Sequence, residues 1–217
     1  RINPGNYTDR KIQQHYNETA YRDALEQTSE KLIPLLKICQ RNGTAIRIGT
    51  NHGSLSSRIV ERYGDTPMGM AMSALEFIAI CEDFGFRNLV LSMKASNVRI
   101  MTESVRLLVA MMDAKGWHYP LHLGVTEAGN GVYGRIKSTA GILPLLYDGI
   151  GDTIRVSLTE HDWSSDVCSS DLWRKYTPPV PPKRPLLESR KAPHVPLPIT
   201  HTNIFAEKAK IRVSKVK

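Results

Sequence analysis

Apolar runs alternate with amphipathic stretches along roughly the first 160 residues of the chain. Four runs have the length and composition of buried strands: AIRIGT at 45–50, NLVLSMK at 88–94, LHLGVT at 121–126 and DTIRVSLT at 152–159. Apolar runs of this kind are typical of parallel strands buried on both faces, and the helical stretches between them are typical of crossover connections. The pattern predicts an α/β fold, a partial (β/α) TIM-type barrel of about four to five units.

Helix start and stop signals flank the amphipathic stretches. Helices are predicted at about 9–41, 54–62, 66–84, 97–115 and 136–148. Thr66 before Pro67 is typical of a helix start, because a capping hydroxyl precedes a residue whose φ already suits the first turn. Gly85 is typical of a helix end. The opening Arg1–Ile2 is predicted to end a strand, followed by a turn over Asn3–Asn6.

The net charge of +8 lies in the C-terminal part of the chain. From Trp173 onward there are 11 Lys and Arg residues but only 2 Asp and Glu residues, so the preceding body is almost neutral. The basic charge therefore does not indicate a nucleic-acid partner for the folded body. No run of about eighteen apolar residues and no leader pattern occurs, so we expect no membrane span and a cytoplasmic location.

Two segments after the body break the pattern. WSSDVCSSDL, within 161–172, lacks any amphipathic period and matches the in-frame translation of a sequencing-adapter oligonucleotide. We interpret it as an artefact; the alternative is a linker rich in serine and aspartate. The proline-dense, basic segment 173–217 predicts a disordered tail. The expected organisation is a barrel-type, substrate-binding body at 1–160, the adapter-derived segment at 161–172 and the tail at 173–217.

Polar side chains stand at the ends of the predicted strands, where α/β proteins bind their ligands. These residues are Arg47, Asn51, His52, Lys94, Glu127, Arg155 and Ser157. Three cations among hydrogen-bonding partners predict a site for a multiply charged anion, most simply a phosphate or diphosphate. Arg155 and Ser157 alternate with apolar neighbours and so share one face. If that face lines the barrel, we expect Arg155 to be a buried cation that requires an anionic partner.

Other candidate groups leave alternatives open. Glu127 binds a ligand hydroxyl or shuttles a proton, or it only neutralises a neighbouring cation. His122 is expected to be a satisfied core histidine rather than a ligand. The cysteines Cys39, Cys81 and Cys168 show no CxxC spacing, and no HExxH motif is present. The sequence therefore predicts neither a disulfide framework nor a metal site.

A series of motifs spanning Arg1 to about Glu160 points to one family. They are RINPGN, IRIGTNHGSL, YGDTPMGM, KASNV, LHLGVTEAG, GRIKSTAGI and GIGDTIRVSLTE, in this order. Together they closely resemble the barrel domain of the 4-hydroxy-3-methylbut-2-enyl diphosphate synthase family, in its larger form with an inserted domain. The resemblance implies reductive ring opening of 2-C-methyl-D-erythritol 2,4-cyclodiphosphate in the methylerythritol phosphate route to isoprenoids. It also implies a [4Fe–4S] cluster and ferredoxin or flavodoxin as electron donor.

The resemblance assigns roles to individual residues. Substrate contacts map onto Asn3, Arg47, Asn51, His52, Lys94, Arg155 and Ser157, with Glu127 near the reacting end. The family cluster domain, with three cysteines and one glutamate, has no counterpart in this chain, so we expect a barrel fragment that is inactive alone. The family works as a homodimer in which one chain's cluster domain covers the other's barrel. Its location is the bacterial cytoplasm, or the plastid stroma in plants.

Two other functions remain open from the sequence. One is a different phosphate-binding barrel, such as a pterin-type synthase, which should ignore the cyclic diphosphate. The other is a non-catalytic binding module, in which the basic tail at 173–217 engages nucleic acid or proline-reading domains. Deleting that tail without loss of binding would remove the second alternative.

Overall fold

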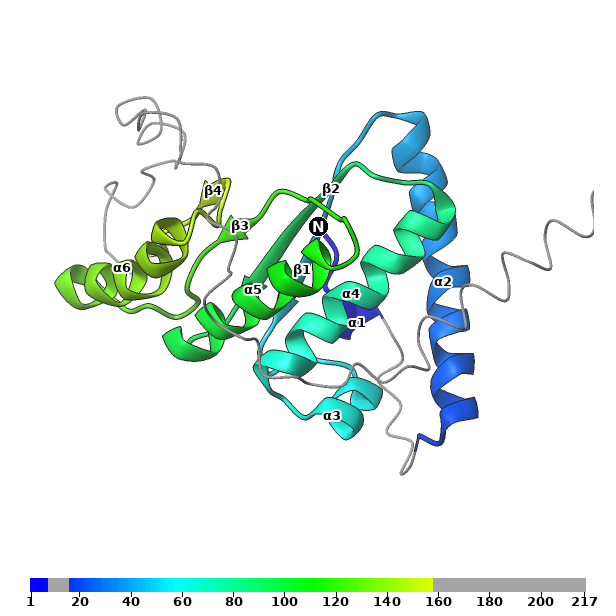
Figure 1. Ribbon diagram of the computed structural model, residues 1–217, viewed down its shortest axis with the longest axis horizontal. Helices are drawn as coiled ribbons and strands as arrows, with labels where there is room; N and C mark the ends of the chain where they lie inside the picture. Colours follow the sequence, from blue (N-terminus) through cyan, green and yellow to red (C-terminus); the bar gives the residue numbers. More distant parts are fainter. Residues whose placement is uncertain (8–15, 158–217) are drawn as a thin grey trace, which may run out of the picture. The chain divides into compact units, whose positions relative to one another are not determined.

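Parallel strands alternate with helices along the described chain, as the hydrophobic pattern predicts (Figure 1). The computed structural model describes residues 1–7 and 16–157. The strands are β1 (Ile46–Asn51), β2 (Leu89–Lys94), β3 (His122–Leu123) and β4 (Thr153–Ile154). The helices are α1 (Pro4–Tyr7), α2 (Glu18–Arg41), α3 (Ser57–Tyr63), α4 (Pro67–Phe84), α5 (Val98–Asp113) and α6 (Gly131–Tyr147).

The strands follow one another in chain order, and every pairing is parallel. β1 pairs with β2 from Ile46↔Leu89 to Asn51↔Lys94, and β3 pairs with β4 at two positions. Isolated bridges at Ile2↔Ile48 and Leu91↔Leu121 add the N-terminal segment to β1 and join β2 to β3. Parallel strands in sequential order, with helices between them, form an arc of a (β/α) barrel. The expected fold class is therefore confirmed for the described residues.

One face of this arc is buried beneath helices. Alternate residues of β1 and β2 point toward helix α4, and among them Ile48 and Leu91 are 1% and 0% exposed. The largest fully buried side chains are Phe77, Leu32, Leu36, Ile48, Ile59, Met70, Ile78, Leu91, Met93, Met101, Leu108 and Leu123. Because successive residues of a strand point to opposite sides, the intervening residues must face the inside of the arc. These intervening residues form the inner face of the arc.

Several helix boundaries agree with the predicted signals. The Thr66 hydroxyl accepts a hydrogen bond from the Gly69 amide at 3.1 Å, and Pro67 occupies the first turn of α4. Gly85 ends that helix in the left-handed conformation, with φ of 81°. The Asn97 side chain caps α5 by accepting from the amides of Arg99 and Ile100. These short-range patterns are read correctly from the sequence because each depends on neighbouring residues only.

Other boundaries differ from the prediction. Helix α6 begins at Gly131, five residues before the predicted start at about 136. The apolar side chains of Val132 and Tyr133 are each 68% exposed, which obscures the amphipathic period that would have revealed the helix start. Helix α3 begins at Ser57 instead of following Ser54 directly. The strands predicted at 121–126 and 152–159 are regular for two residues each.

The N-terminal turn is held by a close backbone approach. The predicted turn over Asn3–Asn6 is instead the short helix α1. The Asn3 side-chain oxygen accepts a hydrogen bond from the Gly5 amide, and the Asn3 carbonyl accepts from the amides of Asn6 and Tyr7. A Cβ atom on Gly5 would lie 1.6 Å from the Ser54 carbonyl oxygen, so only glycine fits between these two loops. This contact explains why Ser54 stays in the loop after β1 and does not cap α3.

A buried polar network joins α2, α3 and α4. The Arg58 guanidinium donates to the Glu76 carboxylate at 2.6 Å, and the Tyr21 hydroxyl donates to the other carboxylate oxygen. Arg58 is 3% exposed and Glu76 is 5% exposed. The Arg58 guanidinium also lies 5.1 Å from the centre of the Tyr21 ring. The network anchors the helix that follows the loop after β1.

The predicted segment boundaries lie beyond the described part of the chain. The ends of the predicted body at 160 and of the adapter-derived segment at 172, and the tail at 173–217, all fall outside the described residues. The same is true of residues 9–15 of the first predicted helix, and α2 is described from Glu18. Within residues 1–7 and 16–157, no helix is both long enough and apolar enough to cross a membrane.

Candidate functional site

The inner face gathers polar residues from five consecutive parallel segments. The register pairs Arg47 with Val90 and Asn51 with Lys94, and it sets Thr153 beside His122. Alternation then places on one face Arg1, Asn3, Arg47, Gly49, Asn51, Ser92, Lys94, His122, Gly124, Thr153, Arg155 and Ser157. Arg1, Arg47, His122 and Thr153 line an open pocket on this face. The sequence predicts polar strand ends, and the register adds the residues deeper along the strands.

Four cations share this face: Arg1, Arg47, Lys94 and Arg155. Burial, followed by the charges of Arg155, Arg47 and Arg1, lowers the pKa of Lys94 from its ordinary value of 10.5 to about 8. Burial also lowers the pKa of Arg47, helped by Arg1 and Arg155. The four positive charges therefore act on one another at short range.

No carboxylate in the described part of the chain forms an ion pair with any of these four cations. Lys94 is 6% exposed, and a buried ammonium without a counter-charge is unfavourable. The folded chain therefore carries an unbalanced positive cluster, the electrostatic arrangement expected of a site that binds a multiply charged anion. Arg47, Lys94 and Arg155 are the cations predicted for this site.

Arg1 is the cation that the sequence alone did not assign to the site. Its guanidinium donates to the Asn51 side-chain oxygen at 3.2 Å. Its side chain passes over Gly49, where an added Cβ atom would lie 2.7 Å from the Arg1 Nε. The sequence did contain a signal for Arg1, because Ile2 is predicted to be a strand residue and its neighbour must face the opposite side.

Gly49→Ala is expected to lower the affinity for inorganic pyrophosphate about three- to tenfold with a stability change of under about 1 kcal/mol. The new methyl group displaces the flexible end of Arg1 and leaves the backbone in place. Calorimetric titration and thermal denaturation measure the two quantities. Gly124→Ala is the contrasting variant, since its Cβ would lie 2.9 Å from the Arg155 backbone oxygen and should cost stability. An unchanged affinity for Gly49→Ala would remove Arg1 from the site.

Asn3 and His52 both make structural contacts near the edge of the inner face. The Asn3 side-chain oxygen accepts from the Gly5 amide at 3.2 Å, which leaves its amide nitrogen for other partners. The His52 ring lies against the loop before α4, with Nε2 at 3.2 Å from the Asp65 carbonyl oxygen and 3.6 Å from its carboxylate. The His52 backbone amide donates to the Lys94 carbonyl. His52 thus ties the β1 loop to the end of β2.

Glu127, Arg155 and Ser157 occupy the far side of the arc. Glu127 is exposed in the loop after β3, with a left-handed φ of 52° that non-glycine residues rarely adopt. The Lys137 ammonium donates to the Glu127 backbone carbonyl at 3.0 Å. Among the described residues, no ion pair joins the Glu127 carboxylate to a cation. Ser157 is half-buried and is the last described residue.

The expectation of a buried Arg155 is wrong. Arg155 is exposed, although its backbone amide donates to the Leu123 carbonyl at 2.8 Å and its charge reaches Lys94. The reason is its position directly after β4 (Thr153–Ile154), which is the last described strand. In the described part of the chain no further strand lies beside β4 to cover the side chain.

His122 also differs from its expected role. Its Nδ1 shares a hydrogen bond with the Thr153 hydroxyl at 2.9 Å, but its Nε2 is buried and has no partner. Burial lowers the pKa of His122 to about 4, followed by the charges of Lys94, Arg47, Arg155 and Arg1. The ring is therefore neutral near pH 7 and faces the cations. The sequence could not show this, because an isolated histidine in an apolar run is compatible with either environment.

Comparison with known proteins identifies the family of this chain. A family model described as the GcpE TIM-barrel domain matches residues 1–168. The chain belongs to the GcpE family.

Bacterial relatives of this GcpE chain carry one name, 4-hydroxy-3-methylbut-2-en-1-yl diphosphate synthase (flavodoxin). The protein of Parabacteroides distasonis is 58% identical over 163 residues, which cover 74% of this chain and 27% of the relative. That of Akkermansia muciniphila is 56% identical over 164 residues, with 74% and 28% covered. That of Protochlamydia amoebophila is 57% identical over 166 residues, with 75% and 25% covered. The chain thus spans about a quarter of the length of these relatives, and the family resemblance is confirmed.

The described residues of this GcpE chain do not suit an iron–sulfur cluster. Cys39 and Cys81 are buried on helices α2 and α4, and burial raises the pKa of Cys81 to about 12. A cluster needs thiolates, which a buried apolar environment disfavours. Within residues 1–7 and 16–157, no group of three or more His, Cys, Asp or Glu side chains is placed to hold a metal ion. Cys168 lies outside the described residues.

Proposed function

We propose that this chain forms part of the substrate-binding domain of a 4-hydroxy-3-methylbut-2-en-1-yl diphosphate synthase. Its ligand is 2-C-methyl-D-erythritol 2,4-cyclodiphosphate, which that enzyme opens reductively on the route to isoprenoids. The observation that carries the proposal is the cluster of four cations on the inner face without a carboxylate partner in the described residues. The names of the relatives supply the reaction, and the charges of the inner face support the type of ligand.

The four cations offer different kinds of contact to a diphosphate. Arg47 and Arg155 offer planar guanidinium groups that suit two phosphate oxygens at once, and Lys94 offers a compact charge between them. Arg1 completes the set and is oriented by Asn51. Ligand binding gives Lys94 the counter-charge that it lacks, so the affinity gains from a charge that is already held in place.

Polar residues at the rim orient the remainder of the ligand. Asn3, Asn51 and Ser157 supply neutral hydrogen-bonding groups. His52 is tied to Asp65 and holds the loop after β1 in position. His52 therefore contributes to substrate binding through the loop that it anchors.

Glu127 is the acid–base group in this proposal. It lies in the loop after β3, and its exposed carboxylate is free of any described ion pair. Its left-handed backbone places it where few residues would be stable without a functional reason. A carboxylate beside bound diphosphate can bind a ligand hydroxyl or transfer a proton during ring opening.

Flavodoxin is the electron donor that the names of the relatives indicate. The described residues do not supply the ligands of the family's [4Fe–4S] cluster. Electron transfer in this proposal therefore depends on residues that this part of the chain does not provide.

Calorimetric titration of the 217-residue chain with the cyclic diphosphate tests the proposal. We expect binding at least tenfold tighter than that of orthophosphate, because the diphosphate engages more of the cations. The affinity should fall as salt rises, since exposed Arg155 and Arg1 are screened. A pterin-type synthase would ignore the cyclic diphosphate, so absence of binding in low salt would overturn the proposal. Replacing exposed Arg99 by Met on helix α5 is the control and should leave the affinity unchanged.

A further inference from the structure

Two unpartnered polar atoms lie side by side on the inner face, between the cations. The Ser92 hydroxyl and the His122 Nε2 are both buried, and neither has a hydrogen-bond partner among residues 1–7 and 16–157. Ser92 on β2 and His122 on β3 are neighbours, because the bridge Leu91↔Leu121 sets the next residues of the two strands next to each other. Native proteins satisfy nearly all buried polar groups, so an adjacent pair of exceptions calls for a missing partner.

The surroundings of the two atoms indicate which chemical group would bind them. Ser92 is 1% exposed, and the Nδ1 of His122 is already engaged by Thr153 at 2.9 Å, so the ring is held in one orientation. Lys94 follows Ser92 on the same face and is the cation that acts most strongly on His122. Both Ser92 and His122 are neutral, and both can donate and accept. Such a pair suits a hydroxyl group, while the phosphate oxygens are better held by the cations.

We infer that Ser92 and His122 bind a hydroxyl group of the polyol part of the ligand, and that they distinguish a polyol diphosphate from bare pyrophosphate. The inference rests on the proposed function, because it assigns a subsite within the same face. Thr153 is a positioning residue, since it acts only by orienting the His122 ring.

The test compares two ligands on the 217-residue chain: the cyclic diphosphate, which carries hydroxyl groups, and inorganic pyrophosphate, which does not. Ser92→Ala and His122→Asn are expected to lower the affinity for the cyclic diphosphate about three- to tenfold and to leave pyrophosphate binding unchanged. His122→Gln places an amide near the position of Nε2 and should retain most of the affinity. Thermal denaturation of each variant separates binding from folding.

The outcomes distinguish the inference from the function on which it rests. Ser92→Ala removes an unsatisfied hydroxyl, so its thermal midpoint should be equal to or above that of the unaltered chain. A lowered midpoint together with equal losses for both ligands would show a structural role and overturn the inference alone. Equal binding of the cyclic diphosphate by all variants would do the same. If the unaltered chain binds neither ligand, the proposed function fails and the hydroxyl subsite fails with it.

Discussion

Glu76→Gln is expected to lower the free energy of unfolding by about 3–5 kcal/mol, because it removes the counter-charge of a buried cation. The substitution leaves the Arg58 guanidinium charged and without its carboxylate, at a site where Arg58 is 3% exposed. It also weakens the acceptor of the Tyr21 hydroxyl. Because the network joins α2, α3 and α4, we expect the loss of stability to affect the cooperative unfolding of all three helices.

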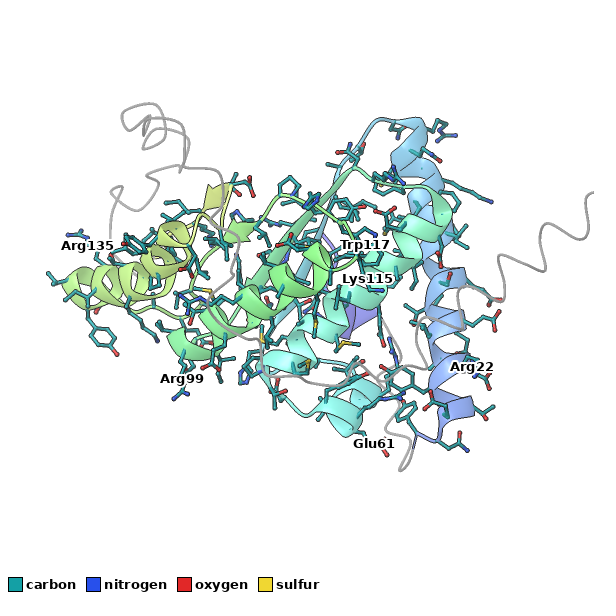
Figure 2. All side chains as sticks on the ribbon, viewed as in Figure 1. Arg22, Glu61, Arg99, Lys115, Trp117 and Arg135 are labelled. Carbon is teal, nitrogen blue, oxygen red and sulfur yellow. The ribbon has the colours of Figure 1, made fainter. Side chains whose placement is uncertain are left out.

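Urea denaturation of the 217-residue chain measures this effect, with Glu103→Gln as the matched control. Glu103 pairs with Arg99 on the exposed surface of α5, where Arg99 projects away from the helix (Figure 2). Such an exposed pair contributes about 0.3–0.5 kcal/mol, so the control should be nearly neutral. Replacing Arg58 and Glu76 together by Met and Leu should recover much of the loss. A Glu76→Gln chain as stable as its control would show that the buried pair is not coupled.

Lys94→Met is expected to act in opposite directions on binding and stability. Pyrophosphate affinity should fall by about tenfold to a hundredfold, since a charged hydrogen-bonding group contributes about 1.5–3 kcal/mol. Stability without ligand should rise, because Lys94 is buried among Arg155, Arg47 and Arg1 and lacks a carboxylate in the described residues. A methionine of similar volume keeps the packing and removes the repulsion.

The pH dependence supplies an independent check on Lys94. Its pKa of about 8 in the folded chain lies below the ordinary 10.5, so between these values the unfolded chain binds more protons and stability rises with pH. The advantage of Lys94→Met should therefore be greatest below pH 8 and shrink between pH 8 and 10.5. Pyrophosphate affinity of the unaltered chain should fall above pH 8, where Lys94 loses its charge.

Thermal denaturation and titration from about pH 7 to 10 measure these changes, and Lys115→Met is the control. Lys115 lies at the exposed end of α5, with its ammonium 5.1 Å from the centre of the Trp117 ring (Figure 2). This lysine is remote from the inner face, so its loss should leave pyrophosphate binding unaltered at every pH. A Lys94→Met chain that is less stable than the unaltered one would contradict the view that Lys94 is held at a cost until an anion binds.

Much of the fold is predictable from the sequence because it depends on local patterns. The runs at 45–50 and 88–94 become β1 and β2, and Thr66 and Gly85 bound α4 as expected. The prediction fails where packing overrides the pattern. Exposed apolar residues at the start of α6 disturb the amphipathic period that would predict it. Ser54 stays in the loop because its carbonyl oxygen packs against Gly5.

The candidate site also contains residues that the sequence predicts and residues that only the strand pairing reveals. The sequence alone predicts Arg47, Lys94 and Arg155 for the site, since parallel strands bring their ends to one edge. The structure places Lys94 at the end of β2 and Arg155 directly after β4, but Arg47 is the second residue of β1 and so lies near the start of its strand. The register between strands was needed to add Arg1 and to set Ser92 beside His122. No pattern along the chain reports which residues of different strands meet, because pairing is a long-range property.

By itself the sequence determined the alternation of strands and helices and the family, and it predicted an anionic ligand. Each of these depends on residue types and their spacing along the chain. Only the tertiary structure decided that Lys94 is buried, that Arg155 is exposed and, within the described residues, that Lys94 lacks a counter-charge and His122 Nε2 lacks a hydrogen-bond partner. Burial and charge balance depend on what surrounds a side chain in space, and neighbours in the sequence supply only a small part of those surroundings.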